Sequence, residues 1–289
     1  MNAVSETSQA EPRRYRRGAL RRRYGDDAPG SGPRLRSDES VRQTVQLLAR
    51  AWSRLPLPVG RAVMVIGYHR VDERTDNMTV RPATFNAQMA WLDEDRASLP
   101  VLSIDVVAMH AAAWPHRACV VTIDDAWADV HTHALPILAA RHIPATLYVP
   151  SGLLGTGEHM TPTQVRECLA AGVSIGAHTR THADLRRSND AALESELRGC
   201  REDLEDLVGV PVTSLAYPFG HLDSRVRTAA HAAGYATALT TRRGWARPGG
   251  DPLRVPRNII EDFEMPAFRA AVHGGLNILQ AAEAMRGNP

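Results

Sequence analysis

Residues 118–125 of the chain read ACVVTIDD, an apolar run that ends in two adjacent aspartates, Asp124 and Asp125. A continuous apolar run of this length is typical of a strand buried on both faces, as in a parallel sheet covered by helices. Polar residues directly after such a strand lie at the edge where parallel α/β folds gather their functional groups. This stretch therefore predicts a buried parallel strand followed by two candidate functional carboxylates.

Other apolar runs of strand length alternate with helical segments along the chain. With residues 119–123, the expected strands are residues 62–68, 145–149, 173–177, 213–217, 236–240 and 253–260. Helix signals lie between them: Thr161, Pro162 and Gln164 form a helix start, and residues 188–208 and 223–233 are each followed by glycine. This alternation predicts a parallel sheet covered by helices, either an open doubly wound sheet or a closed barrel.

The composition excludes some chemistries and sets the domain limits. All 34 basic residues among the 289 are arginine, so Schiff-base lysine chemistry and a Walker A phosphate loop are excluded. Residues 1–36 hold nine arginines against four acidic residues, and we expect residues 1–38 to be a disordered, solvated basic tail with no nucleic-acid partner. Residues 59–289 are expected to form one catalytic domain.

Residues 39–58 are expected to form an amphipathic helix and linker. Val41, Val45, Leu48, Trp52 and Leu55 recur at helical spacing. This face would pack on the domain or make peripheral contact with a membrane, and packing is favoured because one short stripe is weak support for lipid binding. No signal peptide or run of 18 apolar residues is visible, which predicts a cytoplasmic protein, with membrane association left open.

The aspartate pair and a histidine pair are the candidate metal ligands. Two adjacent buried carboxylates repel one another, and a cation would relieve that repulsion. His178 and His182 are four residues apart, so in a helical or turn-like segment both rings reach one side and can bind one ion. Each pair also has a plain explanation: Asp125 would cap a helix beginning near Trp127, and most histidines at this spacing are structural.

The remaining histidines carry no ligand spacing. We expect them to be structural or to face solvent: His110, His116, His131, His133, His142, His159, His221, His231 and His273.

Four motifs at successive strand ends resemble those of the polysaccharide deacetylases, the NodB-homology group of carbohydrate esterase family four. They are Tyr68-His69-Arg70-Val71, Thr122-Ile123-Asp124-Asp125, His178-Thr-Arg-Thr-His182 and Ala216-Tyr-Pro-Phe-Gly220, and the resemblance runs over about residues 63–260. It implies a distorted (β/α) barrel of parallel strands with fewer than eight repeats. It also implies one divalent metal ion, zinc foremost, at the carboxyl ends of the strands.

The resemblance assigns roles by position. Asp125, His178 and His182 would be the metal ligands, and Asp124 the general base. A backbone N–H near Phe219 would stabilise the oxyanion. His69 is the candidate acid, because no Leu-x-His motif follows Gly220, where many relatives carry theirs.

Three positions depart from the family pattern. Ile123 and Ala126 stand where the family usually has Phe and Gly, and Ala216 replaces the arginine that holds the catalytic aspartate in relatives. Arg257, or with less support Arg254, would substitute for that arginine.

The expected function is hydrolysis of an N-acetyl group on an acetylated amino sugar in a glycan, glycolipid or small glycoside. Ester deacetylation is a close variant. The alternatives are a catalytically silent carbohydrate-binding protein and a hydrolase of small cyclic amides on the same barrel. Retention of Asp124 argues against the silent protein, because binding alone requires no base.

Overall fold

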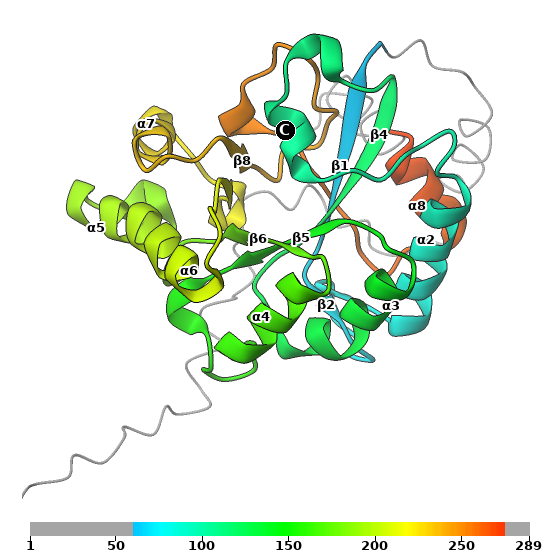
Figure 1. The fold of residues 1–289 in the computed structure, drawn as a ribbon, viewed down its shortest axis with the longest axis horizontal. Coiled ribbons are helices and arrows are strands. Elements are labelled where there is room, and N and C mark those ends of the chain that lie inside the picture. The colour runs from blue at the N-terminus through cyan, green and yellow to red at the C-terminus, as the bar shows by residue number, and fades with distance from the viewer. Residues whose placement is uncertain (1–59, 275–289) are drawn as a thin grey trace, which may run out of the picture. The chain divides into compact units, whose positions relative to one another are not determined.

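The parallel sheet expected from the apolar runs is present in the computed structural model, which describes residues 60–274. Its strands are β1 (Ala62–Tyr68), β4 (Arg117–Ile123), β5 (Ala145–Val149), β6 (Ser174–Ala177), β7 (Ser214–Ala216), β8 (Thr237–Leu239) and β9 (Asn258–Ile259). All seven are paired in parallel, in the order β8-β7-β6-β5-β4-β1-β9 (Figure 1). The expected tail at residues 1–38 and the expected helix and linker at residues 39–58 both lie outside the described range.

Helices follow the strands and cover the outside of the sheet (Figure 1). They are α2 (Pro82–Glu94), α3 (Leu135–Ala140), α4 (Pro162–Ala170), α5 (Asp190–Glu194), α6 (Cys200–Val208), α7 (Ser224–Ala232) and α8 (Met265–Val272). A two-stranded sheet, β2 (Arg70–Val71) with β3 (Thr79–Val80), lies between β1 and α2 in the chain. No helix within residues 60–274 is long and apolar enough to cross a membrane.

The last expected strand differs from the structure. Residues 253–260 were expected to be one strand, but Pro252–Arg254 is a 3-10 turn, Val255 bridges to Leu239 of β8, and only Asn258–Ile259 pair with β1. Pro256 interrupts the run, because proline has no N–H for a ladder and fixes its own φ.

This interrupted segment determines how the sheet closes. Through Val255 it contacts one edge strand of the sheet, and through Asn258 and Ile259 it contacts β1 near the other. The curled sheet is thus joined through a short irregular connection, which confirms the predicted distorted barrel with fewer than eight repeats.

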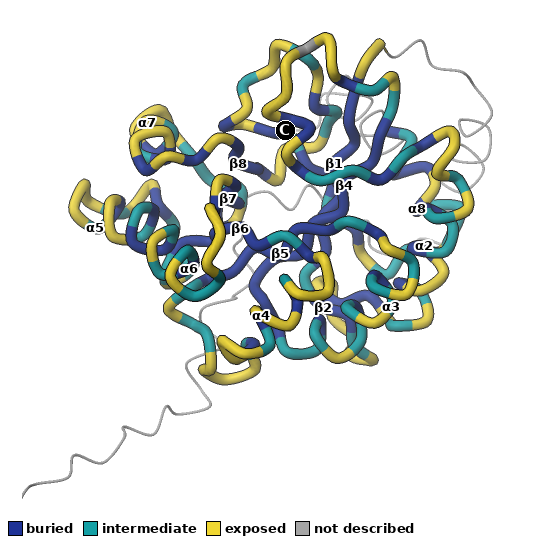
Figure 2. Tube along the Cα trace, viewed as in Figure 1, coloured by how far each residue is buried: buried dark blue, intermediate teal, exposed yellow. Residues whose placement is uncertain are grey.

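One apolar cluster lies inside the curled sheet and a second lies outside it, under the helices. Every residue of β1 is buried, and its side chains alternate: Val63 and Val65 belong to an inner cluster, Met64 and Ile66 to the cluster under the helices. Strands buried on both faces explain why the runs in the sequence are continuously apolar. Figure 2 shows the buried residues concentrated along these strands.

One inner position is shaped by a glycine. A Cβ on Gly176 of β6 would lie 2.5 Å from the ring of Tyr148, which is fully buried and bonded to Ser214 through its hydroxyl at 2.6 Å. The ring therefore occupies space that any other residue at position 176 would need.

Gly176→Ala is expected to lower the free energy of unfolding by about 1–3 kcal/mol, because an extra methyl group in a filled interior forces its neighbours to move. Gly60→Ala is the control, since nothing lies within 4 Å of a Cβ there. Denaturant unfolding of both variants measures the difference, and equal stability of the two would contradict this account of the interior.

Candidate active site

The carboxyl ends of four parallel strands bring the sequence-predicted site residues together. His69 follows β1, Asp124 and Asp125 follow β4, His178 follows β6, and Phe219 lies in the turn after β7. Arg257 enters from the irregular segment just before β9, and His182 lies four residues beyond His178. Each of these seven residues contacts at least one other member, as the distances below show.

Asp125, His178 and His182 offer three possible metal-ligand atoms and are called the ligand set below. The Nε2 atoms of the two histidines each lie 3.4 Å from Oδ1 of Asp125, and the three ligand atoms are within 4.8 Å of one another. Within residues 60–274 this is the one such group of histidine, cysteine and acidic residues. Asp125 Oδ1 is buried without a hydrogen-bond partner, which is the arrangement expected of an oxygen that faces a cation.

The tautomer of His178 is set by the main chain. Its Nδ1 lies 2.7 Å from the carbonyl oxygen of Ala216, to which it donates, so Nε2, on the side of Asp125, is the nitrogen available to bind a cation. Two imidazole nitrogens and one carboxylate oxygen match the three protein ligands of a catalytic zinc site with one open position. The donor set therefore fits a divalent metal ion.

The electrostatics at this point also favour a cation. Burial would raise the pKa of Asp125, but the nearby His178 and His182 rings lower it well below its usual range. Burial lowers the pKa of His182 to about 4. Burial would lower the pKa of His178 as well, but the charges of Asp124 and Asp125 raise it above its ordinary value. The two carboxylates thus draw positive charge to the space between the imidazoles.

Asp124 is held by a buried arginine. Arg257 is 1% exposed, and its two terminal nitrogens donate to the two carboxylate oxygens of Asp124 at 2.6 Å each. Burial would raise the pKa of Asp124, and the charge of Arg257 outweighs that effect and lowers it. Gly67 makes room for this side chain, since a Cβ there would lie 3.1 Å from Arg257 Cδ. Arg254 is exposed and takes no part in the pair.

His69 lies beside the same carboxylate. Its Nε2 is 3.9 Å from Asp124 Oδ2, and its Nδ1 is buried without a hydrogen-bond partner. Burial lowers the pKa of this imidazole below its ordinary value, although Asp124 and Asp125 act in the opposite direction.

Left-handed backbone conformations cluster at the site. Six non-glycine residues among those described have positive φ, and five of them are Asp125, Ala126, Thr179, His182 and Phe219. Such conformations cost about 1–3 kcal/mol each and persist where surrounding contacts fix them. Ala126, with φ of 51°, occupies a conformation that glycine adopts without cost, which explains why a glycine is usual at this position in the resembling motif.

The loop between His178 and His182 is held by acidic side chains from a neighbouring helical segment. Arg180 donates to both carboxylate oxygens of Asp203 on α6 at 2.7 Å, and Thr181 donates to Glu196 through its N–H at 2.9 Å and its hydroxyl at 2.6 Å. Glu196 lies in a π-helical turn, Ser195–Gly199, that joins α5 to α6. This turn interrupts what the sequence predicted as a single helix over residues 188–208.

Phe219 contributes a half-exposed ring at the edge of the ligand set. It is 38% exposed, and its ring centroid lies 4.8 Å from that of His182 in an edge-on arrangement. Its φ of 60° turns the main chain sharply after β7.

Two residues that the sequence did not single out as site residues contact Asp125, and a third packs on one of them. Trp127 donates from its indole Nε1 to Asp125 Oδ2 at 3.1 Å, and His159 Nδ1 lies 2.9 Å from the Asp125 carbonyl oxygen. Arg70 lies over the Trp127 ring. The only sequence signal for them is that Trp127 follows the aspartate pair and Arg70 follows His69.

Comparisons with known proteins find similarity to polysaccharide deacetylases. The sequence model of the polysaccharide deacetylase family matches residues 112–238. The Bacillus subtilis protein YxkH is 25% identical over 68% of this chain and 70% of its own length. The poly-β-1,6-N-acetyl-D-glucosamine N-deacetylase of Staphylococcus epidermidis is 21% identical over 70% of this chain and 80% of its own length.

A solved structure of a polysaccharide deacetylase is also similar to this chain. A polysaccharide deacetylase from Bacillus cereus superposes with a TM-score of 0.65 and 27% identity, covering 73% of this chain and 69% of that one.

Two histidines and one carboxylate beside a second carboxylate, at the carboxyl ends of parallel strands, are residues of the kind that metal-dependent hydrolases use. The chain is similar to the polysaccharide deacetylase family in sequence over residues 112–238 and in structure over 73% of its length. The predicted family and the predicted class, an enzyme that removes acetyl groups from acetylated sugars, are thereby confirmed.

His182→Ala is expected to weaken zinc binding more than about 100-fold, since changes to residues that only orient a ligand already cost 10–100-fold. His131→Ala is the control, because His131 pairs with Glu167 at 2.7 Å on the surface, apart from the set. Equilibrium zinc titration of the metal-stripped proteins measures both affinities. Equal zinc affinity of the two variants would remove His182 from the ligand set.

Proposed function

We propose that this enzyme hydrolyses the N-acetyl amide of an acetylated amino sugar, with Asp125, His178 and His182 holding a divalent metal ion and Asp124 acting as general base. The observation that carries the proposal is the different environment of the two neighbouring carboxylates. Asp124 is paired with Arg257 at 2.6 Å, whereas Asp125 faces two imidazole nitrogens at 3.4 Å. Adjacent carboxylates in distinct environments have distinct roles.

Zinc is the proposed ion, because two imidazole nitrogens and one carboxylate oxygen are ligands of catalytic zinc sites. When bound, such an ion supplies Lewis acidity toward the acetyl carbonyl and toward a water molecule.

Asp124 is suited to accept the proton of the attacking water. Arg257 keeps its pKa below the ordinary value, so the carboxylate is ionised near neutral pH and oriented by two hydrogen bonds. A base that is ionised and fixed in position accelerates proton transfer about 10²–10⁴-fold.

His69 is the proposed acid for the departing amine. The lowered pKa of this buried imidazole makes it neutral near pH 7 before reaction. We infer that the proton taken up by Asp124 reaches the amine through His69, whose Nε2 is 3.9 Å from Asp124 Oδ2. In these steps the water loses one proton and its oxygen bonds to the acetyl carbon, the C–N bond breaks, the amine leaves with that proton, and the acetyl group leaves as acetate.

Stabilisation of the oxyanion is assigned to the main chain at Phe219. Its left-handed turn places this residue beside His182, with the ring centroids 4.8 Å apart. A fixed N–H aimed at developing negative charge is a common device of acyl-transfer enzymes.

The proposed substrate is an acetylated amino sugar in a glycan, glycolipid or small glycoside. The Staphylococcus epidermidis relative is named for an N-acetylglucosamine polymer, which supports an amide rather than an ester as the bond cleaved.

Acetate release from N-acetylglucosamine oligomers tests the reaction. The metal-loaded protein is expected to release acetate, and chelation is expected to abolish the release. Asp124→Asn is expected to retain the metal and lose about 10²–10⁴-fold in kcat. Asp206→Asn, an exposed aspartate on α6, is the control and is expected to match wild type.

Three results would contradict the proposal in different ways. Acetate release by Asp124→Asn at the wild-type rate would remove Asp124 as base. A metal-loaded protein that binds the oligomers without releasing acetate would support a silent carbohydrate-binding protein. Activity confined to small cyclic amides would support the other alternative.

The pairing of Arg257 with Asp124 predicts a change in pH dependence. Arg257→Met removes the charge that lowers the pKa of Asp124, so that pKa rises. The base must be ionised, so the acid limb of the kcat/KM profile is expected to move to higher pH. Arg257→Lys keeps the charge and is expected to show a smaller displacement. Arg254→Met, an exposed control, is expected to leave the profile unchanged, and an unchanged profile in Arg257→Met as well would contradict the pairing's role.

A further inference from the structure

The two oxygens of the Asp125 carboxylate have different neighbours. Oδ2 accepts a hydrogen bond from the indole Nε1 of Trp127 at 3.1 Å. Oδ1 has no hydrogen-bond partner and lies 3.4 Å from the Nε2 atom of each ligand histidine. The indole thus fixes the rotation of the carboxylate so that one oxygen faces both imidazoles equally.

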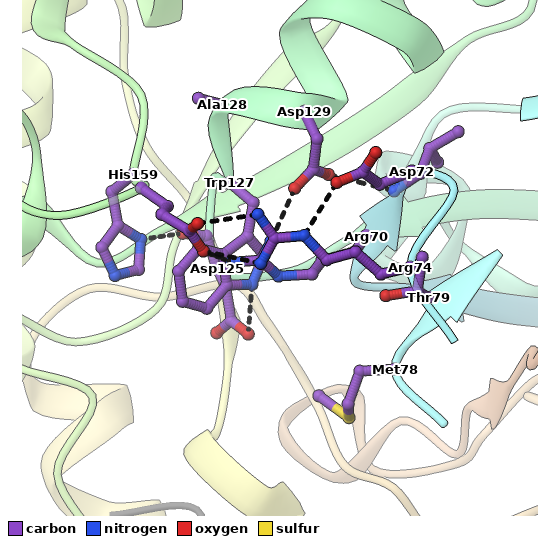
Figure 3. Close-up of polar contacts among 12 residues, drawn as sticks. Arg70, Asp72, Arg74, Met78, Thr79, Asp125, Trp127, Ala128, Asp129 and His159 are labelled. Carbon is purple, nitrogen blue, oxygen red and sulfur yellow. Dashed lines mark hydrogen bonds and ion pairs between the residues drawn. The ribbon is translucent and has the colours of Figure 1, made fainter. Parts of the chain in front are cut away.

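The indole ring of Trp127 packs against two other side chains. Trp127 is 8% exposed; the Arg70 guanidinium carbon lies 3.9 Å from its ring centroid, and His159 stacks on it at 4.1 Å with an interplanar angle of 16°. Among aromatic rings, an indole attracts a cation placed over its face most strongly. Figure 3 shows Arg70, Trp127, Asp125 and His159 gathered at this point.

Arg70 is held in turn by two acidic side chains. It donates to Asp129 at 3.0 Å (Figure 3) and to Glu158 at 2.7 Å. Asp129 also accepts from the N–H of Val71 at 3.0 Å. A guanidinium with two separate partners has little freedom to rotate, so its position over the indole is fixed.

Main-chain contacts complete the support. The N–H of Ala128 donates to the Glu158 carbonyl at 2.8 Å, and the N–H of Met160 donates to the Ala126 carbonyl at 2.7 Å. These bonds tie residues 126–128 to residues 158–160 and hold the left-handed residues Asp125 and Ala126 in place.

We propose that Trp127 is a positioning residue of the metal centre: its indole N–H orients Asp125 for the ion, and Arg70, stacked on the indole, keeps that N–H in place. The proposal rests on the proposed function, because it requires Asp125 to be a metal ligand. Trp127 contacts neither substrate nor ion in this role. It acts through the carboxylate, in the way that hydrogen-bond partners of metal ligands commonly do.

Trp127→Phe separates orientation from packing, because it keeps an aromatic ring beneath Arg70 and removes the N–H. The metal-binding affinity is expected to fall about 10–100-fold, the usual cost of losing such a partner. At saturating zinc, kcat is expected to recover toward wild type and KM for the sugar to stay unchanged.

Trp91→Phe is a matched control. Trp91 on α2 also has an arginine over its ring, Arg269 at 5.5 Å, and a histidine ring at its edge, His273 at 5.7 Å, but it contacts no member of the ligand set. Its zinc affinity is expected to equal wild type. Arg70→Lys is a second variant: it keeps a charge toward Asp129 and Glu158 but not the planar stacking group, and a smaller loss of affinity is expected.

Zinc titration of the metal-stripped proteins, with their thermal unfolding measured beside it, decides the question. If wild type binds zinc and Trp127→Phe binds it within about twofold, the inference is overturned and the proposed function stands. A lower unfolding temperature without weaker zinc binding would likewise leave Trp127 a packing residue. If wild type binds no zinc, the proposed function and this inference both fail.

Discussion

Two neighbouring carboxylates buried at the end of one strand are the constraint on which the site depends. Asp124 and Asp125 are each 2% exposed, so each requires positive charge nearby to remain ionised. The fold supplies it from opposite sides: Arg257 reaches Asp124 from the segment before β9, and two imidazoles reach Asp125 from the loop after β6. In the proposed function, the arginine-paired Asp124 is the base and Asp125, which faces the two imidazoles, is the metal ligand.

The irregular closure of the sheet makes this division possible. Val255 pairs with β8 and Asn258 pairs with β1, so Arg257 lies in the short connection between the two contacts and extends into the interior beside Gly67. A regular strand over residues 253–260 would have formed continuous backbone hydrogen bonds with a neighbouring strand. The interruption at Pro256 instead lets the charged Arg257 side chain bond to Asp124. Ala216 on β7 has no charged group that could do so.

The sequence predicted those features of the structure that depend on the pattern of neighbouring residues. The continuous apolar runs located β1, β4 and β5 within two residues, because strands buried on both faces leave no other pattern. The ligand candidates followed from their order at strand ends. The support around Asp125 was not predictable in this way, because the Arg70–Glu158 contact joins residues 88 apart in the chain and matches no motif. The π-helical turn after α5 was missed for a related reason: its anchoring by Glu196 on Thr181 is a tertiary contact.

The central claim is that Asp125, His178 and His182 together hold the catalytic ion, and anomalous X-ray diffraction from crystals grown with zinc tests it most directly. One strong anomalous peak is expected about 2.0–2.2 Å from Asp125 Oδ1 and from the Nε2 atoms of both histidines, with Asp124 still paired to Arg257. A peak bound by Asp124 instead of Asp125, or no peak between the two imidazoles at saturating zinc, would contradict it.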